Sequence, residues 1–116
     1  MDFNHSLESF ELIHIRGVRN FIDWSIRSER HPHIIFISSI SSIVNWATVH
    51  GEHEPVPETP IDSHDVAQEM GHGESKNVSE RILGVVNEKS GVPVSILRVG
   101  QIGGPLMATG VWNEDE

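Results

Sequence analysis

Hydrophobic positions recur at three- and four-residue steps in the first part of the chain. Between residues 6 and 28 this periodic set consists of Leu7, Phe10, His14, Val18, Phe21, Ile22 and Ile26. That spacing is typical of one face of a helix, so the sequence predicts an amphipathic helix over 6–28 with Ser6 as its N-cap. Gly17 lies inside this helix at a cost of about 1 kcal/mol relative to alanine. We therefore expect Gly17 to permit a close approach to another backbone.

Two short apolar runs predict β-strands. The first is HIIFIS at 33–38 and the second is VPVSILRV at 92–99. Continuous apolar runs of this length are typical of strands that are buried on both faces in a parallel sheet. Between them, residues 50–63 are polar with three prolines and predict a loop. A second helix is predicted from about Glu74 to Lys89, with Gly91 as its C-terminal cap and Pro93 preventing its continuation.

Strand, crossover helix and strand form the βαβ unit of a parallel sheet. The sequence therefore predicts an α/β fold, a partial Rossmann-type fold with parallel strands and a crossover helix. In such sheets ligands bind beyond the carboxyl ends of the strands. A serine cluster at 38–42 follows the first strand, and the turn GQIGGP at 100–105 follows the second. We expect both segments to converge with the start of the second helix.

Charge and composition narrow the possible partners. The formal net charge is -9, with 17 acidic against 8 basic side chains. This charge repels phosphate backbones and anionic lipid surfaces, so we expect neither nucleic acid nor a membrane as partner. The chain has no cysteine, which excludes disulfides and thiolate catalysis and fits a reducing compartment. Together with an N-terminus that lacks the pattern of a signal peptide, this predicts a cytoplasmic protein.

Three motifs occur in an order and spacing that resemble the extended short-chain dehydrogenase/reductases. They are SSISS at 38–42, GHGESK at 71–76 and SILRVGQIGGP at 95–105. Within that group the chain most resembles the thioester reductase domain of fungal nonribosomal-peptide-synthetase-like enzymes of the carboxylic-acid-reductase type, and the likeness extends over residues 1–116. The resemblance implies an NADPH-dependent (NADP-binding) reductase that acts on an acyl thioester held by a carrier protein and releases an aldehyde or an alcohol.

The same resemblance implies roles for individual residues. The family places a serine or threonine after one strand and Tyr-x-x-x-Lys on the following helix. Ser39 matches the catalytic hydroxyl, with Ser38 as the alternative within the serine cluster, and Lys76 matches the lysine. His72 stands at the tyrosine position, and the chain contains no tyrosine. The cofactor-binding positions that the resemblance implies are Ser38, Lys76, Gly100, Gln101 and Ile102.

The chemistry explains these residue types. Hydride attack places negative charge on a carbonyl oxygen, which hydroxyl groups can stabilise as it forms. A lysine ammonium favours the ionised phenol of a neighbouring tyrosine. An imidazole, with its ordinary pKa of about 6.5, can also act as a general acid. However, the charge of Lys76 drives an imidazole at position 72 toward its neutral form, which weakens it as an acid. The alternative interpretation is that His72 is a solvated loop histidine without a catalytic role.

A departure from the family pattern concerns the cofactor phosphates. Dinucleotide folds begin with a strand and a Gly-rich turn that binds the pyrophosphate at a helix N-terminus, and GQIGGP is not in that position. The sequence therefore predicts a fragment of a thioester reductase-like NAD(P)-binding domain that is inactive alone. Only two predicted helices are available to cover the strands, and one strand edge is expected to be bare. This favours a complementing chain or self-association.

Other interpretations follow from the same residues. One is a non-catalytic module that docks a partner through the exposed strand edge, and another is a reductase assembled from separately encoded halves. Histidine pairs at 31 and 33 and at 50 and 53 have short spacings that are weak signals for metal, so we expect no metal site. A Ser39–His72 hydrolase is disfavoured because no G-x-S-x-G turn is present. Arg98 is expected to pair with a nearby carboxylate, and the resemblance leaves a cofactor phosphate open as its partner.

Overall fold

The computed structural model describes residues 5–30 and 32–103 and contains two strands and two long helical segments. In chain order the elements are α1 (Leu7–Phe10), the π-helical segment η1 (Glu11–Ile15), α2 (Arg16–Arg27), β1 (Ile34–Ser39), the 3-10 turn η2 (Ile40–Ser42), α3 (Trp46–His50), α4 (Gly71–Ser90) and β2 (Val94–Val99). A long loop between α3 and α4 includes the three prolines of the sequence prediction. Among the described residues, no helix is long and apolar enough to cross a membrane.

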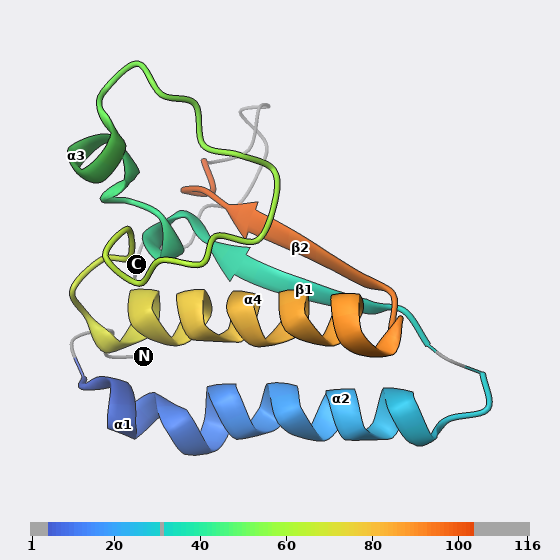
Figure 1. Ribbon diagram of the computed structural model, residues 1–116. Coiled ribbons are helices and arrows are strands. Elements are labelled where there is room, and N and C mark those ends of the chain that lie inside the picture. Colours follow the sequence, from blue (N-terminus) through green and yellow to red (C-terminus); the bar gives the residue numbers. More distant parts are fainter. Residues whose placement is uncertain (1–4, 31, 104–116) are drawn as a thin grey trace, which may run out of the picture.

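The two strands pair in parallel, with α4 as the crossover between them (Figure 1). The pairing runs in register from Ile34 opposite Val94 to Ser39 opposite Val99. The carboxyl ends of both strands therefore lie at the same end of the sheet, as the βαβ unit predicts. The first strand begins and ends one residue later than predicted, and the second begins two residues later at the same end.

The N-terminal helical segment is confirmed over residues 7–27, because α1, η1 and α2 follow one another without a break. The π-helical turn in its middle is not apparent from the periodicity, although it inserts only one residue into the helical register. Ser6 occupies the N-cap position but makes no side-chain capping bond. The expected close approach at Gly17 is not found, because no atom of the described residues lies within 4 Å of the place where its Cβ would stand.

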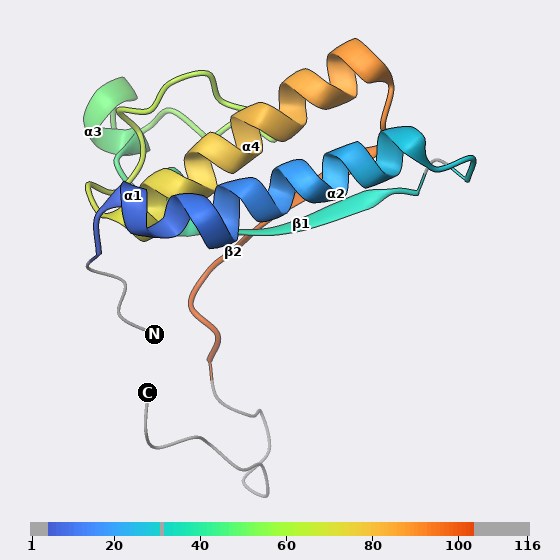
Figure 2. The ribbon, with the colours of Figure 1, turned by 90° about the horizontal axis from the view of Figure 1, so that it is seen from below.

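Both long helices cover the same face of the sheet, and no other element of residues 5–30 and 32–103 covers the opposite face (Figure 2). On the covered face lie Phe36 and Ile96, while Leu83 of α4 is fully buried in the core. On the open face Ile35 is 62% exposed and Ile37 is 53% exposed. The prediction of burial on both faces is therefore wrong for this chain: the apolar runs are real, but all the helices that cover them lie on one side.

Helix α4 begins at Gly71, three residues earlier than the sequence predicted, because two glycines allow its first turn to pack on backbone. A Cβ on Gly71 would collide with the backbone of His5, and one on Gly73 would lie 2.8 Å from the Ser41 carbonyl oxygen. The glycines mark close packing rather than a loop. At the other end, Gly91 adopts a left-handed conformation with φ of 70°, which confirms it as the C-terminal cap.

Candidate functional site

A turn of serines follows β1 at the carboxyl edge of the sheet. Ser39 is the N-cap of η2, and its Oγ accepts hydrogen bonds from the Ser41 backbone N–H at 3.2 Å and from Ser41 Oγ at 2.9 Å. Ser42 Oγ closes the turn by donating to the Ser39 carbonyl oxygen at 2.8 Å. Because Ser39 Oγ accepts both of these bonds, its own proton is left to donate to a ligand.

Ser38 and Ser39 point to opposite faces of the sheet, as successive residues of a strand do. Ser38 is 3% exposed, and its Oγ donates a hydrogen bond to Oε1 of Glu80 on α4. Ser39 lies on the open side with the exposed Ile37 and Val99. The structure therefore favours Ser39 over Ser38 as the hydroxyl that a bound molecule can reach, and it commits Ser38 to the interior.

Lys76 reaches from α4 to the last residues of β1. Its Nζ donates to the Ile37 carbonyl oxygen at 2.8 Å and stands 4.9 Å from the centre of the Phe36 ring. Partial burial lowers the pKa of Lys76, and the negative charge of Glu80 opposes that shift. An ammonium has three N–H donors, so the bond to Ile37 leaves donors for a ligand at the end of β1.

His72 lies on the first turn of α4, one helical turn before Lys76. Its ring makes edge contacts with Phe10 and His14, with ring centres 6.1 Å and 6.5 Å apart. The alternative of a solvated loop histidine is therefore wrong, since His72 is helical and half-buried. Burial, followed by the charges of Lys76 and His14, lowers the pKa of His72, so its imidazole is neutral near pH 7.

His14 completes a small cluster with His72 on the side of α4 that faces the N-terminal helix. It lies in η1, and its ring centre is 5.1 Å from that of Phe10. Burial and then the charge of Lys76 lower the pKa of His14. The helical periodicity predicts His14 only as a member of the hydrophobic face of the first helix. Its proximity to His72 depends on how two helices pack, which local spacing does not determine.

The segment after β2 lies beside the serine turn. A Cβ on Gly100 would stand 3.9 Å from the Ile40 side chain, which brings this segment next to the start of η2. Gln101 and Ile102 follow and are exposed. The expected convergence of the segments after the two strands is therefore found, while the last two residues of GQIGGP and the polar tail lie outside the described residues.

Glu80 is a central residue of this edge that sequence analysis did not identify. It is 2% exposed and pairs with Arg98, with 2.8 Å between the closest charged atoms. The expectation that Arg98 pairs with a carboxylate is thereby confirmed. A carboxylate in the middle of a helix is ordinarily solvent-exposed. The one available signal was its position four residues after Lys76, on the same helical face.

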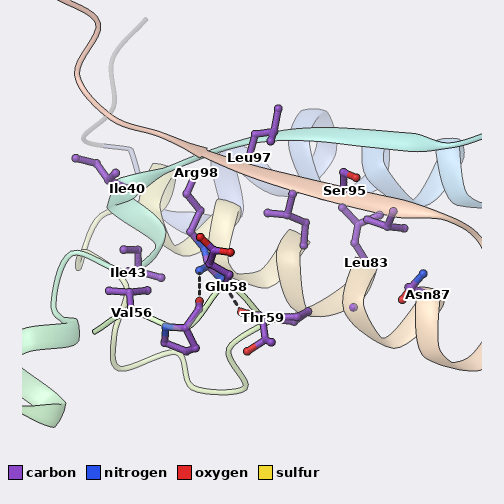
Figure 3. A pocket seen from close by; sticks show the side chains of 15 residues that line it. Ile40, Ile43, Val56, Glu58, Thr59, Leu83, Asn87, Ser95, Leu97 and Arg98 are labelled. Carbon is purple, nitrogen blue, oxygen red and sulfur yellow. Dashed lines mark hydrogen bonds between the residues drawn. The ribbon is translucent and has the colours of Figure 1, made fainter. Parts of the chain in front are cut away.

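A pocket of about 780 Å³ lies between β2, α4 and the loop at 56–60 (Figure 3). Arg98 points into it and donates to the carbonyl oxygens of Pro57 at 3.1 Å and Thr59 at 3.2 Å. Most of the remaining lining is apolar, and it includes none of Ser39, His72 and Lys76. The pocket therefore adjoins this end of the sheet through Ile40 and Arg98, but Ser39, His72 and Lys76 do not line it.

The histidine pairs do not form metal sites within the described part of the chain. No group of three or more His, Cys, Asp or Glu side chains comes together there. His31, one member of the first pair, lies outside the described residues.

Comparison with known proteins gives matches along the full length of the chain. The model of an NAD-binding family, described as male sterility protein, matches residues 1–116. A carboxylic acid reductase of Neurospora crassa is 42% identical over 116 residues, which cover 100% of this chain and 11% of that protein. An adenylate-forming reductase of Serpula lacrymans is 40% identical over 97% of this chain and 10% of its own length. Another, of Heterobasidion annosum, is 36% identical over 100% of this chain and 10% of its own length. The chain therefore spans about a tenth of these relatives.

Proposed function

The chain belongs to the male sterility protein family of NAD-binding domains, and on that premise we propose that it carries the nicotinamide side of an NADPH-dependent reductase site. The observation that supports this most is that Ser39, the Ile37 carbonyl bound by Lys76 and the Gly100–Ile102 segment all lie toward the carboxyl end of two parallel strands. That edge is where ligands bind in open α/β sheets.

The donor set at this edge fits one end of a dinucleotide. Lys76 has ammonium donors suited to ribose hydroxyls, and residues 100–102, which follow β2, are exposed. The described residues include no Gly-rich turn between a strand and a helix that would bind a pyrophosphate. We therefore assign Lys76 and residues 100–102, but no phosphate-binding group, to the cofactor.

A bound reduced nicotinamide supplies the hydride for such a reaction. Ser39 donates a hydrogen bond to the carbonyl oxygen of the substrate and stabilises the negative charge that develops there. Lys76 fixes the ribose and keeps a positive potential at the edge. His72 is neutral near pH 7 because its pKa is lowered. It can donate an N–H hydrogen bond but is a poor source of a full proton, which is a further reason to expect little or no turnover by this chain alone.

The substrate class that we propose is an acyl thioester. Of the three relatives described above, two are named adenylate-forming reductases and one a carboxylic acid reductase, and these names support a substrate derived from a carboxylic acid. A carrier protein that holds the thioester is the proposed partner, and an aldehyde or alcohol is the proposed product. The absence of cysteine fits action in the reducing cytoplasm.

A second candidate function is a docking module, which the open face of the sheet favours. Ile35 and Ile37 are more than half exposed there, and Leu97 of β2 is 48% exposed beside them. Apolar side chains on a contiguous sheet surface are typical of an interface. This function requires no cofactor, so a cofactor titration distinguishes the two candidates.

The test is a titration of the purified chain with NADPH, followed by the fluorescence of the nicotinamide. Lys76→Met removes the proposed ribose contact, and Lys89→Met is the matched control because Lys89 is exposed in the last turn of the same helix. A hydrogen bond to a charged group contributes about 1.5–3 kcal/mol. We therefore expect Lys76→Met to weaken binding about tenfold or more, with Lys89→Met unchanged.

Two results decide between the proposals. Saturable binding that depends on Lys76 supports the reductase site, and His72→Tyr should then raise turnover of an acyl thioester. Absence of saturable binding, or equal binding by the two lysine variants, contradicts the proposal and leaves the docking module.

A further inference from the structure

Glu80 joins three segments of the chain at the candidate site. Its Oε1 accepts hydrogen bonds from Ser38 Oγ in β1 and, at 2.7 Å, from Ser42 Oγ in η2. Its Oε2 accepts from Arg98 Nε in β2 at 2.9 Å. A buried carboxylate is stable only when its charge and its lone pairs are satisfied, and here one helix residue satisfies them with donors from β1, η2 and β2.

These bonds fix the position of Ser39 through its neighbours. The single proton of Ser42 Oγ is shared between Glu80 Oε1 at 2.7 Å and the Ser39 carbonyl oxygen at 2.8 Å. Ser38, the preceding residue, is held by the same carboxylate. The backbone of Ser39 therefore lies between two residues that Glu80 binds, although Glu80 and the Ser39 side chain are on opposite faces of the sheet.

The same carboxylate fixes α4 against β1. Lys76 stands one turn before Glu80, and its Nζ bonds the Ile37 carbonyl oxygen at 2.8 Å. Two successive turns of α4 thus contact two successive residues of β1, Ile37 and Ser38. Sliding of α4 along the strand would break the bonds of both Lys76 and Glu80.

We propose that Glu80 is a positioning residue that holds Ser39 and Lys76 in their relative places at the cofactor edge. The inference rests on the proposed reductase function, because it assigns Glu80 a role toward the two residues that we place at the cofactor and substrate. Glu80 itself is buried between α4 and the sheet, and we assign it no contact with the cofactor or the substrate.

Lysine signals in NMR spectra test this role without any cofactor. The chain has two lysines, Lys76 and Lys89, so the Nζ signal of Lys76 has to be distinguished from one other lysine signal. Glu80 opposes the lowering of the Lys76 pKa. In Glu80→Gln we therefore expect the pKa of Lys76 to fall further. Glu88→Gln changes an exposed glutamate of the same helix; it is the control and should leave the pKa of Lys76 unchanged.

Ser42→Ala provides a second variant that keeps the buried ion pair intact. It removes the link between Glu80 and the Ser39 carbonyl, while Asn77 Nδ2 still holds the Ser42 carbonyl oxygen at 3.1 Å. We expect a folded protein in which the amide signals of residues 39–41 shift and NADPH binding weakens about threefold or more. Ser90→Ala removes a similar bond to a backbone carbonyl at the far end of α4 and should leave both unchanged.

The outcomes separate the two hypotheses. If the unaltered chain binds no NADPH, the proposed function fails, and the NMR signals alone still judge Glu80. If Ser42→Ala leaves the amide signals of residues 39–41 at their original positions, the positioning role is overturned, whether or not Glu80→Gln folds. An unchanged Lys76 titration in a folded Glu80→Gln protein also overturns it.

Discussion

Gly73 offers a sharp test of how the start of α4 packs on the serine turn. In a helix, replacing glycine by alanine gains about 0.8–1 kcal/mol from backbone entropy. At Gly73 the new Cβ would lie 2.8 Å from the Ser41 carbonyl oxygen and 3.0 Å from the Gln68 carbonyl oxygen. Both are backbone atoms, and the Ser41 carbonyl also accepts a bond from the Gln68 N–H at 2.8 Å, so neither can move independently.

The expected magnitude follows from these two opposing effects. Overpacking costs about 1–3 kcal/mol, which exceeds the helical gain, so we expect Gly73→Ala to lower the free energy of unfolding by about 1 kcal/mol. Gly17→Ala is the matched control, because Gly17 is also helical and has no atom within 4 Å of its missing Cβ. There the helical gain of about 1 kcal/mol should appear in full.

Urea unfolding followed by circular dichroism measures both variants. With an m-value of about 2 kcal/mol/M, the two urea midpoints should differ by about 1 M and lie on opposite sides of the unaltered protein. Stabilisation of both variants by equal amounts would refute the close packing of α4 on the serine turn. It would also weaken the argument that this packing places His72 on the helix.

Two further predictions concern pH and the open face of the sheet. Burial lowers the pKa values of His14 and His72 from 6.5, so the unfolded chain binds more protons than the folded chain as the pH falls below 6.5. The two neutral histidines therefore contribute fully to the free energy of unfolding above pH 6.5, and this contribution is lost on acidification. The melting temperature should therefore fall as the pH is lowered from 7 to 5.5, and less steeply in His14→Gln; equal slopes would contradict a role for the cluster. On the open face, Leu97→Lys should reduce self-association in light scattering with little change in melting temperature. Leu83 is fully buried, so Leu83→Ala should instead lower the free energy of unfolding by about 2–5 kcal/mol. A large loss of stability in Leu97→Lys would show that this face is covered.

Local pattern was sufficient for the two long helical segments and both strands of this fold, but not for η2 and α3. The helical period identified the N-terminal helix, and the apolar runs identified both strands to within two residues. The βαβ rule gave their parallel pairing, because connections of this kind follow from chirality rather than from particular side chains. Gly91 was assigned correctly for a similar reason, since a left-handed residue at a helix end favours glycine.

What the sequence did not show depends on contacts between distant segments. Glu80 is a charged residue in a helix, and its position four residues after Lys76 does not by itself indicate that it is buried with Arg98. Gly71 and Gly73 have the composition of a loop, but their function is to let backbones meet. Gly17 is the opposite case: it suggested a close approach to another backbone, and no such approach is found among the described residues.

The parallel pairing also has a consequence for the order in which the chain assembles. Ile34 pairs with Val94, so the sheet forms only when residues 60 positions apart meet (94 − 34). Long-range pairings of this kind form late and slowly, because loop closure precedes any gain from the contact, whereas a helix forms within about a microsecond. Helices α2 and α4 are therefore expected to form before the strands meet. The edge that carries Ser39 and residues 100–102 is complete only at the final step of folding, and until then two apolar strands remain open to other chains.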